Sequence, residues 1–225
     1  MKVYRTMAAV WILRVEGNVG CGKSTLLHHL RERLSRARVV PEPVHGWKEH
    51  IRGVYGDESS DMWKLPMQAL SACTRAEALL GAIRKASSDT QAPYDSPHVL
   101  VVERSDESAA IFGRLTLADP ELAAFEKISG RYAQIFQRLR DHHDLREARV
   151  YLRALPKTCS QRIAQRSRDG ENGIGMTFLC DLHEAHETEF SNADLVVGCD
   201  DIASDEVAAR VIDFVTEHCG TESRS

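Results

Sequence analysis

The sequence lacks the features that mark several classes of protein. No apolar run approaches the roughly 20 residues that a membrane-spanning helix requires. The chain has six cysteines, but no two show C-x-x-C spacing, which argues against a zinc site or a redox dithiol. We see no secretion or transit signal at its start. Reduced thiols and a cytoplasmic location are therefore the simplest expectation.

The sequence also has no overall excess of positive charge. Its 29 Lys and Arg residues are outnumbered by 33 Asp and Glu residues, giving a formal net charge of -4. We therefore expect no nucleic-acid partner, because such partners usually require a basic surface. The length of 225 residues and hydrophobic content of 43% suit one core. We expect a single domain over residues 1–220 and a frayed tail at 221–225.

Short apolar segments alternate with longer amphipathic segments along the chain. The apolar segments predict strands at residues 8–15, 39–40, 98–102, 149–152 and 194–197. The amphipathic segments predict helices at residues 24–36, 65–85, 105–117, 122–139, 158–166, 178–190 and 205–217. A turn-rich connection is expected at residues 90–97. This alternation predicts an α/β fold with a parallel five-stranded sheet and helices on both faces.

A glycine-rich loop lies between the first expected strand and the first expected helix. It comprises Gly17, Asn18, Val19, Gly20, Cys21, Gly22, Lys23, Ser24 and Thr25. The pattern G-x-x-x-x-G-K-S at such a junction is typical of the P-loop of nucleotide-binding proteins. Backbone N–H groups and the helix N-terminus can converge on phosphate oxygens there. Lys23 can reach the β- and γ-phosphates, and Ser24 can hold Mg²⁺.

A carboxylate follows the second expected strand. Residues just beyond the carboxyl ends of parallel strands face the ligand crevice, so Glu42 is expected near the P-loop. A carboxylate in that position can accept a proton from an attacking hydroxyl. The alternative is a surface glutamate before a proline turn.

An acid and an arginine end the third expected strand. Glu103 has the position of a Walker-B acid, which holds Mg²⁺ directly or through water. Arg104 would point a fixed cation into the same crevice. The alternative is an ordinary ion pair at a strand end.

Three arginines precede a glycine-rich break near residue 170. Arg162 and Arg166 share a helix face because they are four residues apart, and Arg168 lies just beyond them. A solvated basic face is the usual interpretation of such a run. In a phosphate-handling enzyme, the same run predicts an arginine-rich lid that supplies charge to the transition state.

These four motifs, in this order, resemble those of the deoxynucleoside kinase family, which includes cellular deoxycytidine, deoxyguanosine and thymidine kinases and viral thymidine kinases. The phrases that carry the resemblance, between residues 15 and 187, are VEGNVGCGKSTLL, EPVHGW, WKLPMQ, ERSDESA, YLRALPKTCSQRIAQRSR and FLCDLHEAHE. The resemblance implies an enzyme that uses ATP and Mg²⁺ to phosphorylate the 5′-hydroxyl of a deoxynucleoside. It also implies a homodimer formed through helices that flank the sheet.

The resemblance implies roles for individual residues. Glu42 would be the general base, Arg104 would lie near the 5′-oxygen, and Glu103 would lie on the Mg²⁺ side. The implied nucleoside pocket consists of Trp47, Tyr55, Gln68, Arg75, Ala109, Phe112 and Glu171. Within it, Gln68 would bind the base edge and Phe112 would stack on the base. Tyr55 and Glu171 would reach the sugar.

The signals for base preference are mixed. Arg75 is typical of deoxycytidine- and deoxyguanosine-type members, which pair it with an aspartate at the position of Ala109. A small residue at that position is instead typical of thymidine-accepting members. Asp106 or Glu107 is a candidate partner for Arg75. Thymidine and deoxycytidine are the favoured substrates.

Two other functions fit the P-loop. A nucleoside monophosphate kinase would share the fold, but Glu42 would repel the phosphate of such an acceptor. A non-catalytic nucleotide-binding switch would need neither a general base nor a nucleoside pocket.

Overall fold

The central element of the fold is a parallel sheet. The structure is a computed structural model that describes residues 9–34, 37–56, 59–88, 98–168, 170–171 and 173–220. Within these residues the strands are β1 (Val10–Gly17), β2 (Ala37–Val40), β3 (His98–Glu103), β4 (Leu145–Arg153) and β5 (Leu195–Gly198). They form one sheet in the order β2-β3-β1-β4-β5, and every pairing is parallel. The predicted five-stranded α/β architecture is confirmed.

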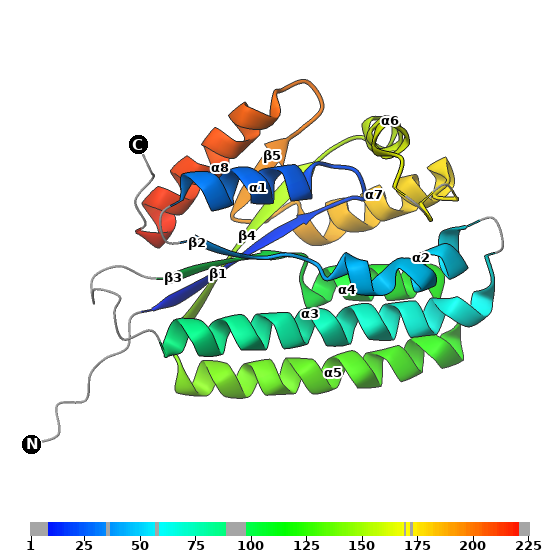
Figure 1. Cartoon of the computed structure of the whole chain (residues 1–225), viewed down its shortest axis with the longest axis horizontal. Helices are drawn as coiled ribbons and strands as arrows, with labels where there is room; N and C mark the ends of the chain where they lie inside the picture. Colours follow the sequence, from blue (N-terminus) through cyan, green and yellow to red (C-terminus); the bar gives the residue numbers. More distant parts are fainter. Residues whose placement is uncertain are drawn as a thin grey trace, which may run out of the picture.

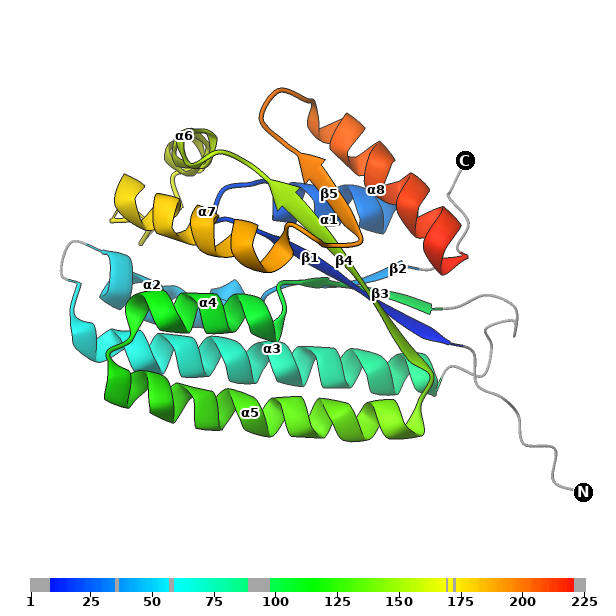
Figure 2. The same cartoon turned by 180° about the vertical axis from the view of Figure 1, so that it is seen from behind.

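Helices cover both faces of this sheet, as predicted (Figure 1). They are α1 (Lys23–Arg33), α2 (Lys48–Tyr55), α3 (Lys64–Ser87), α4 (Asp106–Thr116), α5 (Asp119–His142), α6 (Pro156–Arg166), α7 (Met176–Phe190) and α8 (Ser204–Cys219). Figures 1 and 2 show α1 and α8 on one face and the long pair α3 and α5 on the other. The described part of the chain contains no helix long and apolar enough to cross a membrane.

The alternating faces of β1 explain this two-sided arrangement. Leu13 and Val15 pack into the cluster that includes α1 and α8. Val10 and Ile12 pack against α3 on the opposite side. Because both faces of a parallel strand are buried in this way, the strand is apolar along most of its length. β1 is the central strand of the sheet, and the P-loop begins at its carboxyl end.

The sequence did not predict α2 or the two short 3-10 turns, η1 (Val44–Trp47) and η2 (Asp61–Trp63). Glycine in a helix lowers its propensity, and α2 contains Gly53. The structure explains this glycine, because an added Cβ would lie 2.3 Å from the ring of Trp63. The close packing of α2 on η2 thus requires Gly53, the same residue that makes α2 difficult to predict from the sequence.

Several predicted boundaries were too short. The observed α3 and α5 extend beyond the predicted ends, and β4 begins at Leu145 rather than at residue 149. The turn-rich connection at 90–97, the tail at 221–225 and the first residue of the 8–15 strand lie outside the described residues.

His186 occupies an aromatic pocket between α7 and the sheet. Its ring contacts the rings of Phe112, Tyr151 and Phe190, and the residue is completely buried. Its Nδ1 lies 2.6 Å from the carbonyl oxygen of Leu182, so Nδ1 carries the hydrogen and donates it. Burial, with a smaller effect of the Arg104 charge, lowers the pKa of His186 from 6.5 to about 3. His186 is therefore neutral in the folded protein.

We predict that His186 contributes to acid destabilisation. Its pKa is 6.5 in the reference state and about 3 in the fold, so the unfolded chain binds an extra proton between these values. The free energy of unfolding must therefore fall as the pH falls through this window, by about 2 kcal/mol between pH 7 and pH 5. His186→Phe keeps an aromatic ring and removes the titration. Urea unfolding at both pH values should show a smaller loss in the variant, and equal losses would contradict the prediction.

Candidate active site

The carboxyl ends of β1, β2 and β3 open into one cavity of about 310 Å³. Such a position is where open parallel sheets bind ligands. Most of the residues predicted from the sequence line this cavity. The exceptions are Gly17, Asn18, Cys21 and Ala109. The cavity therefore brings together the P-loop, the two predicted acids, the lid arginines and most of the predicted nucleoside pocket.

The P-loop depends on glycine at three positions. Gly17, Gly20 and Gly22 have φ values of 141°, 82° and 108°, in the region that glycine favours. An added Cβ at Gly20 would lie only 2.6 Å from the carbonyl oxygen of Cys159 in α6. The loop thus packs directly against α6, the helix that carries Arg162 and Arg166.

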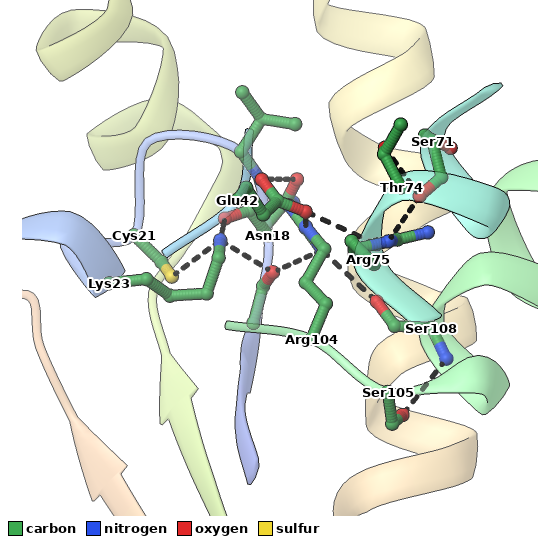
Figure 3. Close-up of polar contacts among 12 residues, drawn as sticks. Asn18, Cys21, Lys23, Glu42, Ser71, Thr74, Arg75, Arg104, Ser105 and Ser108 are labelled. Carbon is green, nitrogen blue, oxygen red and sulfur yellow. Dashed lines mark hydrogen bonds and ion pairs between the residues drawn. The ribbon is translucent and has the colours of Figure 1, made fainter. Parts of the chain in front are cut away.

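Lys23 folds back over this loop, as Figure 3 shows. Its Nζ donates to the carbonyl oxygens of Asn18 at 2.8 Å and Gly17 at 3.1 Å. The side chain of Asn18 donates in turn to the carbonyl oxygen of Leu179 in α7, at 2.9 Å. Cys21 is buried in the core below the loop. These contacts hold the lysine at the cavity wall.

Glu42 is held by two arginines (Figure 3). Its Oε1 lies 3.1 Å from a terminal guanidinium nitrogen of Arg75 and 3.5 Å from Nε of Arg104. The side chains of Glu42 and Arg75 are 13% and 14% exposed, so the pair is largely shielded from solvent. A carboxylate with this degree of burial requires such partners. Glu42 is thus a fixed carboxylate at the cavity wall rather than a free surface residue.

Arg75 pairs with Glu42 and not with Asp106 or Glu107, the two partners suggested from the sequence. Glu107 instead accepts a hydrogen bond of 2.6 Å from Arg149 in β4. Arg75 pairs with Glu42 because its position in the middle of α3 places it beside the end of β2. This partner could not be read from spacing, since the two residues are 33 positions apart.

Arg104 adopts an unusual backbone conformation. Its φ of 67° lies in the left-handed region, which is uncommon for a residue with a side chain. Its guanidinium donates to the carbonyl oxygen of Gly17 at 3.0 Å and to Oγ of Ser108 at 3.1 Å. The same group lies 4.7 Å from the ring centre of Phe112. Strain of this kind is typical of functional positions held by their surroundings.

Glu103 is a buried acid at the end of β3. Burial, with the nearby charge of Glu42, raises the pKa of Glu103, whereas Lys23 and Arg104 act in the opposite direction. Its ionised form is therefore disfavoured in the protein alone. A cation bound beside it would favour that form.

The three arginines predicted for a lid fall into two groups. Arg162 donates to the backbone carbonyl oxygens of Cys21 at 3.2 Å and Cys199 at 2.7 Å, so it is fixed against the P-loop. Arg166 and Arg168 both contact the buried carboxylate of Glu171, at 2.6 and 3.2 Å. Glu171 thus joins the two arginines of the segment predicted as a lid. The same segment is bound to α2, because the backbone N–H of Gly173 donates to the carbonyl oxygen of Tyr55.

Most of the residues predicted for the nucleoside pocket line this cavity. Buried Trp47 donates its indole N–H to Oγ1 of Thr74 at 3.0 Å, and Gln68 is 5% exposed. Burial raises the pKa of Tyr55 to about 12, so its phenol stays protonated. Ala109 is buried in a separate cluster with Leu117 and Phe125, so its role in base selection stays a prediction.

Sequence reasoning missed some of the cavity lining. The additional residues are Val44, Ile51, Met67, Ser71 and Ile174. The spacing of Gln68, Ser71 and Arg75 on one face of α3 could have identified Ser71. Ile51 belongs to α2, which the sequence did not predict.

One cavity thus brings a P-loop together with the carboxylate of Glu42, a combination that suits a P-loop phosphotransferase. The deoxynucleoside kinase family model matches residues 13–220. The chain therefore belongs to the deoxynucleoside kinase family, and it is an ATP-dependent deoxynucleoside kinase.

Named relatives support this assignment. The thymidine kinase of Ictalurid herpesvirus 1 (strain Auburn) is 30% identical over 214 residues, covering 89% of this chain and 84% of the relative. Deoxycytidine kinase 1 of Xenopus laevis is 26% identical over 204 residues, covering 78% and 72%. Deoxycytidine kinase of Homo sapiens is 26% identical over 205 residues, covering 78% and 74%.

We predict that Gly20→Ala damages both folding and nucleotide binding. The positive φ of Gly20 costs about 1–2 kcal/mol for a residue with a side chain. The added methyl would also displace α6 through Cys159. Urea unfolding and calorimetric titration with ATP should show lower stability and weaker binding. Gly46→Ala is the control, because a methyl there meets no atom within 4 Å. Equal behaviour of the two variants would refute the proposed close packing.

Proposed function

We propose that this enzyme transfers the γ-phosphoryl group of ATP to the 5′-hydroxyl of thymidine or deoxycytidine, for nucleotide salvage and DNA precursor synthesis. The observation that carries the proposal is the carboxylate of Glu42, which lines the same cavity as the P-loop and contacts Arg75 and Arg104. The names of the thymidine and deoxycytidine kinases among the relatives support the choice of substrates.

In this proposal Glu42 takes the proton of the 5′-hydroxyl as that oxygen attacks the γ-phosphorus. The two arginines fix the carboxylate, so the acceptor oxygen and the base can be aligned before reaction. Lys23 leaves its two carbonyl partners to contact the β- and γ-phosphates. Arg166 and Arg168 supply positive charge as the phosphoryl group moves.

Mg²⁺ is the second proposed cofactor, and the donor set suits it. Ser24, which carries a hydroxyl, and Glu103, which carries a carboxylate, line the same cavity. Mg²⁺ is usually held by one or two protein oxygens together with waters and substrate phosphates. When bound, the ion would neutralise phosphate charge. It would also favour the ionised form of Glu103, which burial otherwise disfavours.

The proposal for assembly is a cytoplasmic homodimer that forms through α3 and α5. These helices lie together on the outside of the molecule (Figure 2). Ile135 of α5 is 41% exposed, and a side chain at Gly81 or Gly130 would meet no atom within 4 Å. A surface that is open and partly apolar supports contact with a second copy. The absence of a nucleic-acid partner stays a prediction from the net charge.

We predict that Glu42→Gln lowers kcat for nucleoside phosphorylation by roughly 10²–10⁴-fold, because a positioned base contributes that much. ATP affinity should change little, since Glu42 contacts the acceptor side. Steady-state kinetics and calorimetric titration with ATP would measure both quantities. Glu49→Gln is the control, as Glu49 is an exposed carboxylate on α2. Full activity of Glu42→Gln would show that the mechanism is wrong.

The same assay distinguishes the two alternative functions. The unmodified enzyme should phosphorylate thymidine or deoxycytidine but not their 5′-monophosphates, since Glu42 would repel a phosphate at that position. Transfer to thymidine monophosphate in place of thymidine would favour a monophosphate kinase. ATP turnover that does not depend on any nucleoside would favour a switch.

A further inference from the structure

The side-chain amide of Gln68 contacts Thr116, and this contact affects how the amide can bind a base. Gln68 lies on α3, lines the cavity and is 5% exposed. Its Nε2 donates to Oγ1 of Thr116 at 3.3 Å, across the contact between α3 and α4. Oγ1 of Thr116 lies 2.7 Å from the carbonyl oxygen of Phe112, one turn earlier in α4. Thr116 does not itself line the cavity.

These two distances determine which way the amide points. A threonine hydroxyl carries one hydrogen, and two oxygens 2.7 Å apart require a hydrogen between them. The hydroxyl of Thr116 therefore donates to Phe112, and toward Gln68 it can only accept. A reversed amide would bring Oε1 against this hydroxyl, with two acceptors facing each other. The carboxamide is thus held with its nitrogen toward α4.

The orientation of an amide matters because bases present two kinds of edge. Cytosine and adenine place an amino donor beside a ring-nitrogen acceptor. Thymine, uracil, guanine and hypoxanthine place a carbonyl acceptor beside a ring N–H donor. An amide pairs with both atoms of an edge, and changing from one kind of edge to the other requires the amide to reverse. For bases held in the same position, a fixed amide can match only one kind.

We propose that Thr116 determines base specificity: by holding the amide of Gln68 in one orientation, it restricts the enzyme to one of these two edge classes. Thr116 is a positioning residue, since it acts through Gln68. The inference rests on the proposed function, in which Gln68 binds the base. It applies to bases that bind in the same pose, because a base that is turned over or shifted presents its donor and acceptor in the opposite order.

The test compares nucleosides that differ only in this edge. Deoxyuridine and deoxycytidine form one such pair, and deoxyinosine and deoxyadenosine form the other; neither pair differs by a 5-methyl group. The unmodified enzyme should prefer one member of the pair that it phosphorylates by about tenfold or more in kcat/KM, because the wrong edge leaves buried groups unpaired. Thr116→Val removes the hydroxyl at nearly constant shape and should reduce this ratio about tenfold.

Controls separate this effect from a general loss of packing. Thr116→Ser keeps the hydroxyl and should retain the ratio. Thr188→Val removes a similar hydroxyl, bonded to the carbonyl oxygen of Glu184 on the exposed side of α7, and should also retain it. If Thr116→Val does not fold, Thr116→Ala takes its place, with the same expected ratio.

The outcomes are distinguishable from failure of the proposed function. Equal use of both members by the unmodified enzyme would overturn the inference and leave the kinase function intact. A ratio that is unchanged in Thr116→Val would do the same. An enzyme that phosphorylates no nucleoside would overturn the proposed function and this inference together.

Discussion

The ion pair of Glu42 with Arg75 and Arg104 is the interaction on which the active site depends. It joins the end of β2, the middle of α3 and the end of β3 at one carboxylate oxygen. A partly buried carboxylate is costly without such partners, so the three elements must meet at this point. The parallel sheet makes the meeting possible, because the carboxyl ends of its strands share one edge.

The same balance of charge extends around the cavity. Lys23 is held by carbonyl oxygens of the P-loop, and Glu171 contacts both Arg166 and Arg168. In the proposed reaction Lys23 exchanges its carbonyl partners for phosphate oxygens. Arg104 is already held by Gly17 and Ser108, and a cation fixed in this way needs little rearrangement to stabilise charge during reaction. Fixing Arg104 in this position has an energetic cost, because its backbone is held in a left-handed conformation.

The sequence was sufficient for the architecture and for most of the cavity, because strand and helix periodicities and the P-loop pattern are local signals. The sequence was insufficient for features that depend on contacts between residues far apart in the chain. Gly53 made α2 unpredictable from the sequence, because the glycine is required by the ring of Trp63, which belongs to η2. The partner of Arg75 lies on another strand, and Ala109 packs in a core cluster outside the cavity. The bond between Gln68 and Thr116 likewise joins two helices that local spacing cannot relate.

Identification of the phosphorylated product tests the central claim most directly, namely that Glu42 faces a sugar hydroxyl that receives the phosphoryl group. The enzyme would be incubated with ATP, Mg²⁺ and thymidine or deoxycytidine and followed by phosphorus NMR. The account predicts a phosphomonoester coupled to the 5′-methylene protons, formed in equal amount with ADP. Release of inorganic phosphate with ADP, and no nucleoside phosphoester, would contradict it.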